Sequence, residues 1–263
     1  MVDDIREFWD EQAETHGSSD LATAPDHHYR MLEIESILRA IDRVRHETIL
    51  DVGCGNGFST MQIAKRFPEA LITGIDYSKP MIDEARKLRA ANAEFFVADV
   101  LSLSRHKQLA GAHYDVVLST RCLINLASWT EQKTGILEMQ SMLAPTGKLI
   151  VVENVLDGLN NLNRVRAKFG LPAMEVRWHN KYLALPELMR FLNEMQLTPD
   201  YVENIGNMYY LASRVIYAKL CKDQGIEPDY NNPINAIAAQ LPTLGEAYMY
   251  SPNFMFVCGE TRS

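Results

Sequence analysis

The 263-residue sequence contains no apolar run long enough for a transmembrane helix, which needs about 20 such residues. Its acidic N-terminus lacks the apolar segment of a secretory signal. Cysteines are few and dispersed, which argues against a zinc cluster and against a disulfide framework. Compact groupings of Asp, Glu and His at metal-ligand spacing are also missing. We therefore expect a reduced, cytoplasmic protein with no membrane segment and no metal site.

Basic residues are outnumbered, because 26 Lys and Arg face 34 Asp and Glu and give a net charge of −8. Proteins that bind nucleic acid or anionic membranes usually carry a basic excess, so neither partner is expected. Internal repeats, low-complexity tracts and long linkers are absent as well. With 47% apolar residues, the composition is typical of a globular protein. We predict a single domain over residues 1–263, and the sequence leaves open whether it is a monomer or a homodimer.

Between residues 46 and 154, short apolar runs alternate with amphipathic helical patterns. Apolar strands of this kind are buried on both faces, as in a parallel sheet that helices cover. The predicted fold class is α/β, with a doubly wound, mostly parallel, Rossmann-like sheet. The expected strands are Thr48–Val52, Leu71–Ile75, Glu94–Val97, Asp115–Ser119 and Lys148–Glu153. The helices expected between them are Ser59–Arg66, Lys79–Ala90 and Ser128–Leu143.

The segments on either side of this core follow a different pattern. Residues 1–45 predict two helices, and the first carries Ile5, Phe8, Trp9 and Ala13 on one face. Residues 155–248 predict more helices and one edge strand, and 249–263 predict a final edge strand. We interpret 1–45 and 155–248 as a helical cap over one end of the sheet. Its late helices are expected at Leu156–Phe169, Pro186–Met195, Tyr209–Lys222 and Pro233–Leu241, and the last two strands at Thr198–Ile205 and Asn253–Val257.

A glycine-rich turn follows the first expected strand, in the segment ILDVGCGNGF at 49–58. Alternate glycines permit unusual backbone angles and let a ligand lie against the main chain, and the next helix points unpaired N–H groups at it. The second strand ends at Asp76, whose carboxylate can accept hydrogen bonds from both hydroxyls of an adenosine ribose. A nicotinamide dinucleotide is the nearest rival ligand. Its motif usually places a third glycine where this chain has Phe58, and it needs a second nucleotide-binding half that we do not find.

From about residue 48 to residue 154, the sequence resembles the class I S-adenosylmethionine-dependent methyltransferases. LDVGCGNG (50–57) is similar to that family's first motif, which lies under the methionine part of the cofactor. GIDYS (74–78) is similar to the second, with Asp76 on the ribose, and VADV (97–100) to the third, with Asp99 at the adenine amino group. YDVVLS (114–119) resembles the fourth strand, and LAPTGKL (143–149) the turn into the fifth. Both aspartates also have a simpler interpretation as helix caps.

The resemblance implies S-adenosylmethionine as cofactor, S-adenosylhomocysteine as product, and 46–154 as the cofactor-binding core. In the N-terminal segment, Arg30 is a candidate for the methionine carboxylate, with an ordinary surface arginine as the alternative. The expected cofactor-binding residues are Trp9, Arg30, Asp51, Gly53, Cys54, Gly55, Asp76, Tyr77, Met81, Asp99, Val100 and Ser119.

Methyl transfer from a sulfonium is an in-line displacement, so catalysis depends on holding the acceptor opposite the methyl group. A base is needed only if the acceptor must lose a proton. Arg121, after the fourth strand, is a candidate contact for an anionic acceptor or else a structural ion pair. His179, in the segment RWHN (177–180), is the preferred base, and His28 is a second candidate. Tyr209 belongs to a tyrosine- and arginine-containing stretch (209–214), for which dispersed surface side chains are the alternative interpretation.

These observations predict an enzyme that methylates a small polar or anionic acceptor: a sugar, a sugar phosphate, a carboxylate or an amine. Oxygen is favoured over nitrogen as the acceptor atom. The long cap is the reason, because such an enclosure suits a small molecule better than a macromolecular surface. Two alternatives stay open: an RNA or protein methyltransferase, and a non-catalytic sensor or assembly subunit that binds S-adenosylmethionine. A cavity that reaches the methyl group favours the enzyme, and packed side chains there favour the sensor.

Overall fold

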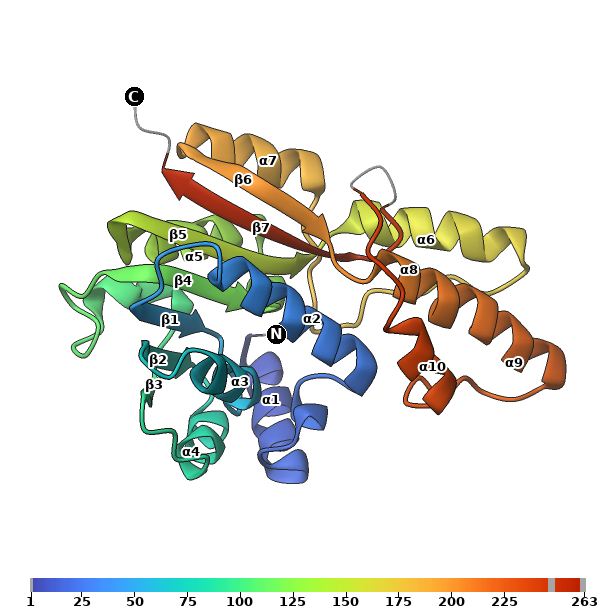
Figure 1. The fold of residues 1–263 in the computed structure, drawn as a ribbon, viewed down its shortest axis with the longest axis horizontal. Helices are drawn as coiled ribbons and strands as arrows, with labels where there is room; N and C mark the ends of the chain where they lie inside the picture. Colours follow the sequence, from blue (N-terminus) through green and yellow to red (C-terminus); the bar gives the residue numbers. More distant parts are fainter. Residues whose placement is uncertain (1, 246–248, 261–263) are drawn as a thin grey trace.

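The computed structural model describes residues 2–245 and 249–260, which form one seven-stranded mixed sheet flanked by helices (Figure 1). The strand order is β3-β2-β1-β4-β5-β7-β6, and β7 is antiparallel to both neighbours while the other pairs are parallel. The predicted α/β fold is confirmed. The strands are β1 (Thr48–Val52), β2 (Leu71–Asp76), β3 (Ala93–Val97), β4 (Tyr114–Thr120), β5 (Leu143–Asn154), β6 (Leu197–Asn204) and β7 (Asn253–Glu260).

Three helices connect the parallel strands: α3 (Phe58–Arg66), α4 (Lys79–Lys87) and α5 (Trp129–Ser141). Serine side chains begin two of them, because Ser78 and Ser128 each accept a hydrogen bond from a first-turn backbone N–H. α4 ends at Lys87 rather than at Ala90. Arg89 has a φ of +49°, a left-handed conformation that a helix does not continue through.

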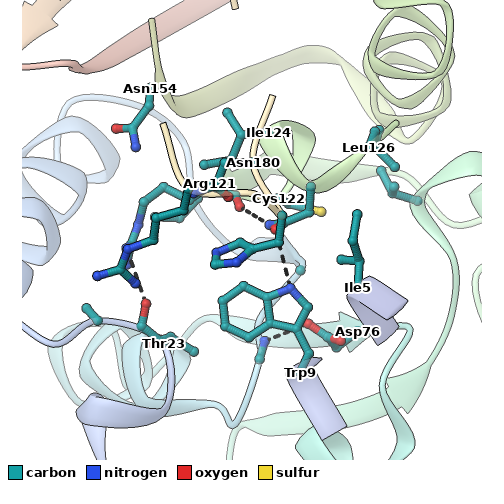
Figure 2. A pocket seen from close by; sticks show the side chains of 18 of the residues that line it. Ile5, Trp9, Thr23, Asp76, Arg121, Cys122, Ile124, Leu126, Asn154 and Asn180 are labelled. Carbon is teal, nitrogen blue, oxygen red and sulfur yellow. Dashed lines mark hydrogen bonds between the residues drawn. The ribbon is translucent and has the colours of Figure 1, made fainter. Parts of the chain in front are cut away.

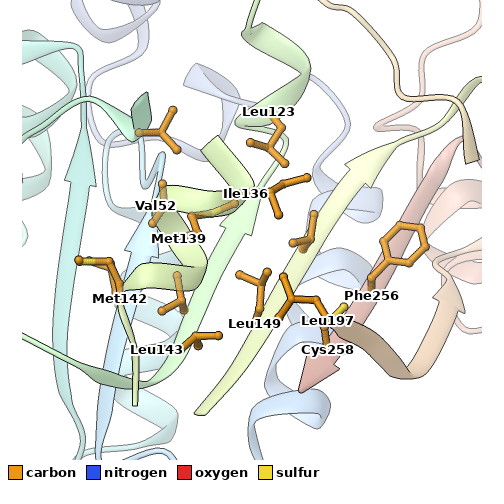
Figure 3. Close-up of a cluster of buried hydrophobic side chains, with 14 of the residues drawn as sticks. Val52, Leu123, Ile136, Met139, Met142, Leu143, Leu149, Leu197, Phe256 and Cys258 are labelled. Carbon is orange, nitrogen blue, oxygen red and sulfur yellow. The ribbon is translucent and has the colours of Figure 1, made fainter. Parts of the chain in front are cut away.

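Strand side chains alternate between two hydrophobic clusters, one on each face of the sheet. Val117 of β4 belongs to the first cluster together with Ile136 and Met139 of α5, which Figure 3 shows against the sheet. Its neighbours Val116 and Leu118 belong to the second cluster, which α3 covers. Because both faces are covered, the central parallel strands are largely apolar, and this is the pattern from which they were predicted.

The N-terminal segment forms α1 (Val2–His16), the short 3-10 helix η1 (Asp20–Ala22) and α2 (His27–Ile41). α1 packs against α4, and α2 packs against α3. Asn56 of the glycine-rich turn donates hydrogen bonds to the carbonyls of Gly17 and Ser19, at 2.8 and 2.7 Å. The link between α1 and η1 is thereby held against the turn that follows β1.

The late segment comprises α6 (Leu156–Lys168), α7 (Leu185–Glu194), α8 (Asn207–Tyr210), the π-helical η4 (Leu211–Tyr217), α9 (Ala218–Gln224) and α10 (Pro233–Ala238). α6 and α8 to α10 extend beyond the strand ends, whereas α7 lies beside β6 (Figure 1). Leu188 and Leu192 of α7 belong to the hydrophobic cluster on the face that α5 covers. The cap over the strand ends therefore consists of the other late helices. Parts of the predicted segments at residues 1, 246–248 and 261–263 lie outside the described residues.

The final strand corrects one expectation. β7 does not lie at the edge of the sheet but is inserted between β5 and β6, and β6 is the edge strand. The residues from Phe254 to Cys258 are all buried, so this strand needs a partner on each side. β6 carries polar residues such as Thr198 and Asp200, which tolerate an edge. Among the described residues, no helix combines the length and the apolar character needed to cross a membrane.

Candidate cofactor and acceptor site

A cavity of about 340 Å³ lies at the carboxyl ends of β1, β2 and β4 (Figure 2). Ligands of open α/β sheets bind at this edge. Residues of α1, α2 and the 174–182 segment complete its wall, together with Tyr210 and Arg214. The expected site residues that line it are Trp9, Arg30, Gly53, Cys54, Gly55, Asp76, Tyr77, Met81, Asp99, Val100, Arg121 and His179.

The glycine-rich turn forms the floor of this cavity. Gly53 has a φ of +73°, and a Cβ built there would lie only 2.6 Å from Cβ of Cys122. Any side chain at this position would therefore have to displace the segment that follows β4. The N–H groups of Gly53 and Cys54 both donate to the Ile75 carbonyl, at 2.8 and 2.9 Å, which ties the turn to the end of β2. The main chain is thus fixed where a ligand would lie against it.

Asp76 projects from the end of β2 toward the turn. Its carboxylate accepts backbone hydrogen bonds from Gly55 at 3.0 Å and from Ser78 at 2.9 Å. Burial raises its pKa to about 6, and these two hydrogen bonds oppose the rise. Ser78 caps α4 by itself, so Asp76 is not needed as a helix cap. Asp99 fits both the ligand-contact and the helix-cap interpretation. It lines the cavity, and its Oδ1 accepts a hydrogen bond from the Leu101 N–H at the start of η2 (Val100–Arg105).

Two arginines of the cavity wall share one buried carboxylate. Arg30 of α2 pairs with Glu33 through Nη1, and Nε of Arg121 lies 3.1 Å from the other oxygen of Glu33. Arg121 also donates to the Thr23 carbonyl at 3.2 Å (Figure 2). This ion pair joins the segment after β4 to the N-terminal helices. Nε of Arg30 is buried and has no hydrogen-bond partner within the described part of the chain. It is a free donor of the kind that the carboxylate of an amino-acid ligand requires.

S-adenosylmethionine fits these residues. The glycine floor, the ribose acceptor Asp76 and the unpaired donor of Arg30 match its amino-acid and ribose parts in the order that the motifs imply. When bound, this cofactor supplies a methyl group activated by a positively charged sulfur. The chain's own residues then have to hold the acceptor and exclude water.

Glu153, at the end of β5, is a site residue that the sequence analysis missed. Its two oxygens accept hydrogen bonds from the N–H groups of Leu123 and Ile124, at 2.7 and 3.3 Å, in the 3-10 helix η3 (Leu123–Asn125). It is fully buried, and burial raises its pKa to about 8. Glu153 thereby fixes the segment that carries Arg121 and Cys122, although it does not line the cavity itself. Its position within an apolar strand was the available signal.

His179 closes the cavity within a group of aromatic rings. Its ring stacks on Phe8 of α1 with centroids 4.3 Å apart, and Trp9 and Trp178 approach it edge-on. Nδ1 is buried and finds no hydrogen-bond partner in residues 2–245 and 249–260. Burial and the neighbouring Arg177 lower its pKa to about 4. The expectation that His179 is a general base conflicts with this pKa, because such a ring is only weakly basic near neutral pH.

The two other candidate catalytic residues lie outside the cavity wall, which corrects the expectation for both. The Tyr209 hydroxyl is buried against Asp26, with distances of 2.8 and 2.9 Å to its two oxygens. It thus secures the cap rather than facing a ligand. The His28 ring lies 3.4 Å from the Asn231 carbonyl, at the junction between α2 and the loop before α10.

Two expected cofactor contacts are corrected as well. Asp51 shares the face of β1 that α3 covers, and its Oδ2 accepts a hydrogen bond from Thr60 at 2.6 Å beneath the glycine-rich turn. Burial raises its pKa to about 6. Ser119 is fully buried within β4. Strand alternation points both side chains into helix-covered faces instead of toward the cavity.

Several cavity-lining residues are not among the expected site residues of the sequence analysis. They are Asp26, which caps α2, Tyr29 of α2, Asn154 at the end of β5, Asn180 and Tyr182, and Tyr210 with Arg214. The clustering of polar and aromatic residues at 177–182 and 209–214 was the signal for the last group. No group of three His, Cys, Asp or Glu residues with metal-binding proximity occurs among the described residues.

Comparisons with known proteins agree with this site. A family model described as a methyltransferase domain matches residues 49–147. A malonyl-[acyl-carrier protein] O-methyltransferase of Halalkalibacterium halodurans is 30% identical over 125 residues, which cover 46% of this chain and 44% of that protein. The chain thus matches less than half the length of this curated relative.

Two solved structures share the fold across nearly the whole chain. The CcbJ methyltransferase from Streptomyces caelestis has a TM-score of 0.61 at 13% identity and covers 97% of this chain and 98% of its own. The N-methyltransferase NodS from Bradyrhizobium japonicum, in complex with S-adenosyl-L-homocysteine, has a TM-score of 0.56 at 16% identity, with 97% and 99% covered. Residues 49–147 are thus similar to a methyltransferase domain, and the two solved structures share the fold in which the glycine-rich turn lies.

Proposed function

We propose that this protein transfers a methyl group from S-adenosylmethionine to an oxygen atom of a small polar acceptor. The observation that best supports this proposal is the extent of the cavity. It continues from the glycine-rich turn and Asp76, past the end of β4, to Tyr210 and Arg214 of the cap. A ligand bound along the turn therefore shares one cavity with the compartment lined by Tyr210 and Arg214.

This continuity favours an enzyme over a sensor. A protein that only senses the cofactor has no need of a compartment beyond the methyl group, whereas an enzyme must admit an acceptor there. The compartment is formed by two segments far apart in sequence, the N-terminal helices and the late cap. Their ion pair between Asp26 and Arg214 closes it over the strand ends.

The enclosure also favours a small molecule over RNA or protein as the acceptor. The site lies behind α1, whose Trp9 donates a hydrogen bond to Asn125 at 3.3 Å. A net charge of −8 gives no electrostatic support for RNA binding. The matched relative named for malonyl-acyl carrier protein supports oxygen as the acceptor atom.

The test follows S-adenosylhomocysteine formation in a mixture of purified protein, S-adenosylmethionine and one acceptor at a time. Sugars, sugar phosphates, carboxylic acids and amines form the panel, with transfer RNA and a denatured protein as macromolecular comparators. The proposal predicts acceptor-dependent turnover with a small molecule and none with the two macromolecules. Turnover confined to a macromolecule would contradict it, as would cofactor binding without turnover on any acceptor.

A further inference from the structure

The cap end of the cavity presents hydrogen-bond donors whose acceptors are missing. Arg214 is 6% exposed, and its Nη2 and Nη1 are taken by Asp26 and by the Ser213 hydroxyl. Its Nε has no hydrogen-bond partner in the part of the chain that the structure describes. A buried, unpaired guanidinium N–H costs free energy unless a ligand satisfies it.

The Asp26 carboxylate beside these donors is already saturated. One oxygen of Asp26 accepts from the Tyr29 N–H, the other accepts from Arg214, and the Tyr209 hydroxyl lies against both. Glu33 pairs with Arg30 through Oε2, and its Oε1 lies 3.1 Å from Nε of Arg121 but accepts no hydrogen bond within the described residues. A ligand beside Arg214 therefore meets a spare donor next to a carboxylate, that of Asp26, which can accept little more. Oxygen atoms with a negative charge satisfy such a surface best.

Two tyrosines add further donors. Tyr210 and Tyr182 line the same compartment, and the Arg214 guanidinium lies 5.1 Å from the centre of the Tyr210 ring. Burial raises the pKa of both phenols, so they keep their protons near neutral pH. They can donate hydrogen bonds to an anion, but they cannot remove a proton from an acceptor.

His179 is the one histidine among the described residues of the cavity wall. With a pKa of about 4 it is a poor base for the deprotonation of an alcohol or an ammonium group. An acceptor that is already an anion requires no such step.

On the basis of the function proposed above, we propose that the acceptor is a carboxylic acid, held at its carboxylate by Arg214, Tyr210 and Tyr182 and methylated to an ester. A lone pair of a carboxylate oxygen forms the new O–C bond to the methyl carbon. The C–S bond breaks, and its electron pair stays on sulfur, which loses its positive charge. No proton moves, and the products are the methyl ester and S-adenosylhomocysteine.

Binding provides the first test. Protein saturated with S-adenosylhomocysteine is titrated calorimetrically with acetate, succinate, citrate and trans-aconitate, and with succinamide as the uncharged match. We expect at least one carboxylate to bind, succinamide to bind at least tenfold more weakly than succinate, and Tyr210→Phe to weaken carboxylate binding about tenfold. Tyr201→Phe on the edge strand β6, outside the cavity wall, is the matched control. If the amide binds as well as the acid, or if no carboxylate binds, the proposal is wrong.

Kinetics provides the second test and separates this proposal from the proposed function. With the best carboxylate acceptor, we expect S-adenosylhomocysteine formation to show a solvent deuterium isotope effect near one and no rise in rate that follows the ionisation of a base. Asp76 and Glu153, with pKa values of about 6 and 8, titrate in or near the same pH range as such a base, so the isotope effect carries the test. Turnover confined to alcohols or amines, with a rate that rises with pH, would overturn the carboxylate assignment and leave the methyltransferase intact. Failure to bind S-adenosylhomocysteine at all would contradict both the carboxylate assignment and the proposed methyltransferase function.

Discussion

Arg214 of the late cap and Asp26 at the start of α2 form a buried ion pair, with Nη2 of the arginine 2.5 Å from Oδ2 of the aspartate. The two residues are 188 positions apart in the sequence. Asp26 also begins α2 by accepting the Tyr29 N–H, and it receives the Tyr209 hydroxyl. One carboxylate thus holds the N-terminal helices and the late cap together over the strand ends, and the cavity exists only because both are in place.

Replacement of Asp26 by asparagine should destabilise the protein by about 3 kcal/mol or more, because it leaves a buried guanidinium without its counter-charge. Asparagine still caps a helix, so the loss reports the ion pair rather than the cap. Denaturant unfolding measures the change. The control is Asp223→Asn on α9, which breaks the exposed pair with Lys219 and should cost about 0.5 kcal/mol or less. Equal losses of unfolding free energy in the two variants would show that the buried ion pair stabilises the protein no more than the exposed one.

Gly53→Ala should damage both stability and cofactor binding. The new Cβ would sit 2.6 Å from Cβ of Cys122, in a backbone with a φ of +73°. Gly170→Ala is matched in backbone strain, with a φ of +65°, but nothing lies within 4 Å of its Cβ. That control should cost about 1 kcal/mol and leave S-adenosylhomocysteine affinity unchanged. Thermal unfolding and calorimetry together separate the two effects, and unaltered affinity in Gly53→Ala would contradict the role of the turn as cofactor floor.

Asp76→Ala should weaken cofactor binding by more than tenfold, because two ribose hydroxyls lose the carboxylate that accepts them. Asp83→Ala is the control. Asp83 lies in α4, the helix that follows β2, and forms an exposed ion pair with Lys79. Calorimetric titration with S-adenosylhomocysteine gives both affinities, and a circular dichroism spectrum verifies that each variant is folded. Unchanged affinity in Asp76→Ala would remove that residue from the ribose site.

His179 should titrate near pH 4, below the ordinary histidine value of about 6.5. Because folding lowers this pKa, the folded state favours the neutral ring. Its contribution to stability is therefore fully present above pH 6.5 and is lost as the pH falls through about 4. NMR of the ring protons measures the titration, and His179→Phe, which keeps an aromatic ring beside Phe8, should reduce the acid-induced loss of stability. A measured value at or above 6.5 would restore His179 as a candidate base.

The sequence predicted those helices and strands that a local pattern of apolar and polar residues defines. β1 was predicted with its observed bounds, because a short buried strand between two turns leaves a clear apolar run. The position of β7 was not predictable in this way. It pairs with β5, about 100 residues earlier in the chain, and with β6, about 55 residues earlier, and no local pattern records either contact.

The same distinction holds for the site. Residues at the strand ends, such as Gly53 and Asp76, line the cavity because the motif fixes where each strand stops, and their contact with the cofactor stays a prediction. Tyr209 and Tyr210 are neighbours, yet only Tyr210 lines the cavity. Which of the two lines the cavity depends on the rotation of α8 and of the π-helical η4 that follows it, and no local sequence pattern records that rotation. Glu153 was missed although it ends an apolar run, because its role in holding the segment after β4 depends on hydrogen bonds to residues 29 and 30 positions earlier.

The most direct test of the whole account is calorimetric titration of the purified protein, freed of bound ligand, with S-adenosylmethionine and with S-adenosylhomocysteine. The account predicts micromolar binding of both ligands at one site per chain, with the affinity for S-adenosylhomocysteine reduced in Asp76→Ala. Absence of binding by folded protein would contradict it, because the glycine-rich turn and the cavity above it would then serve a different ligand.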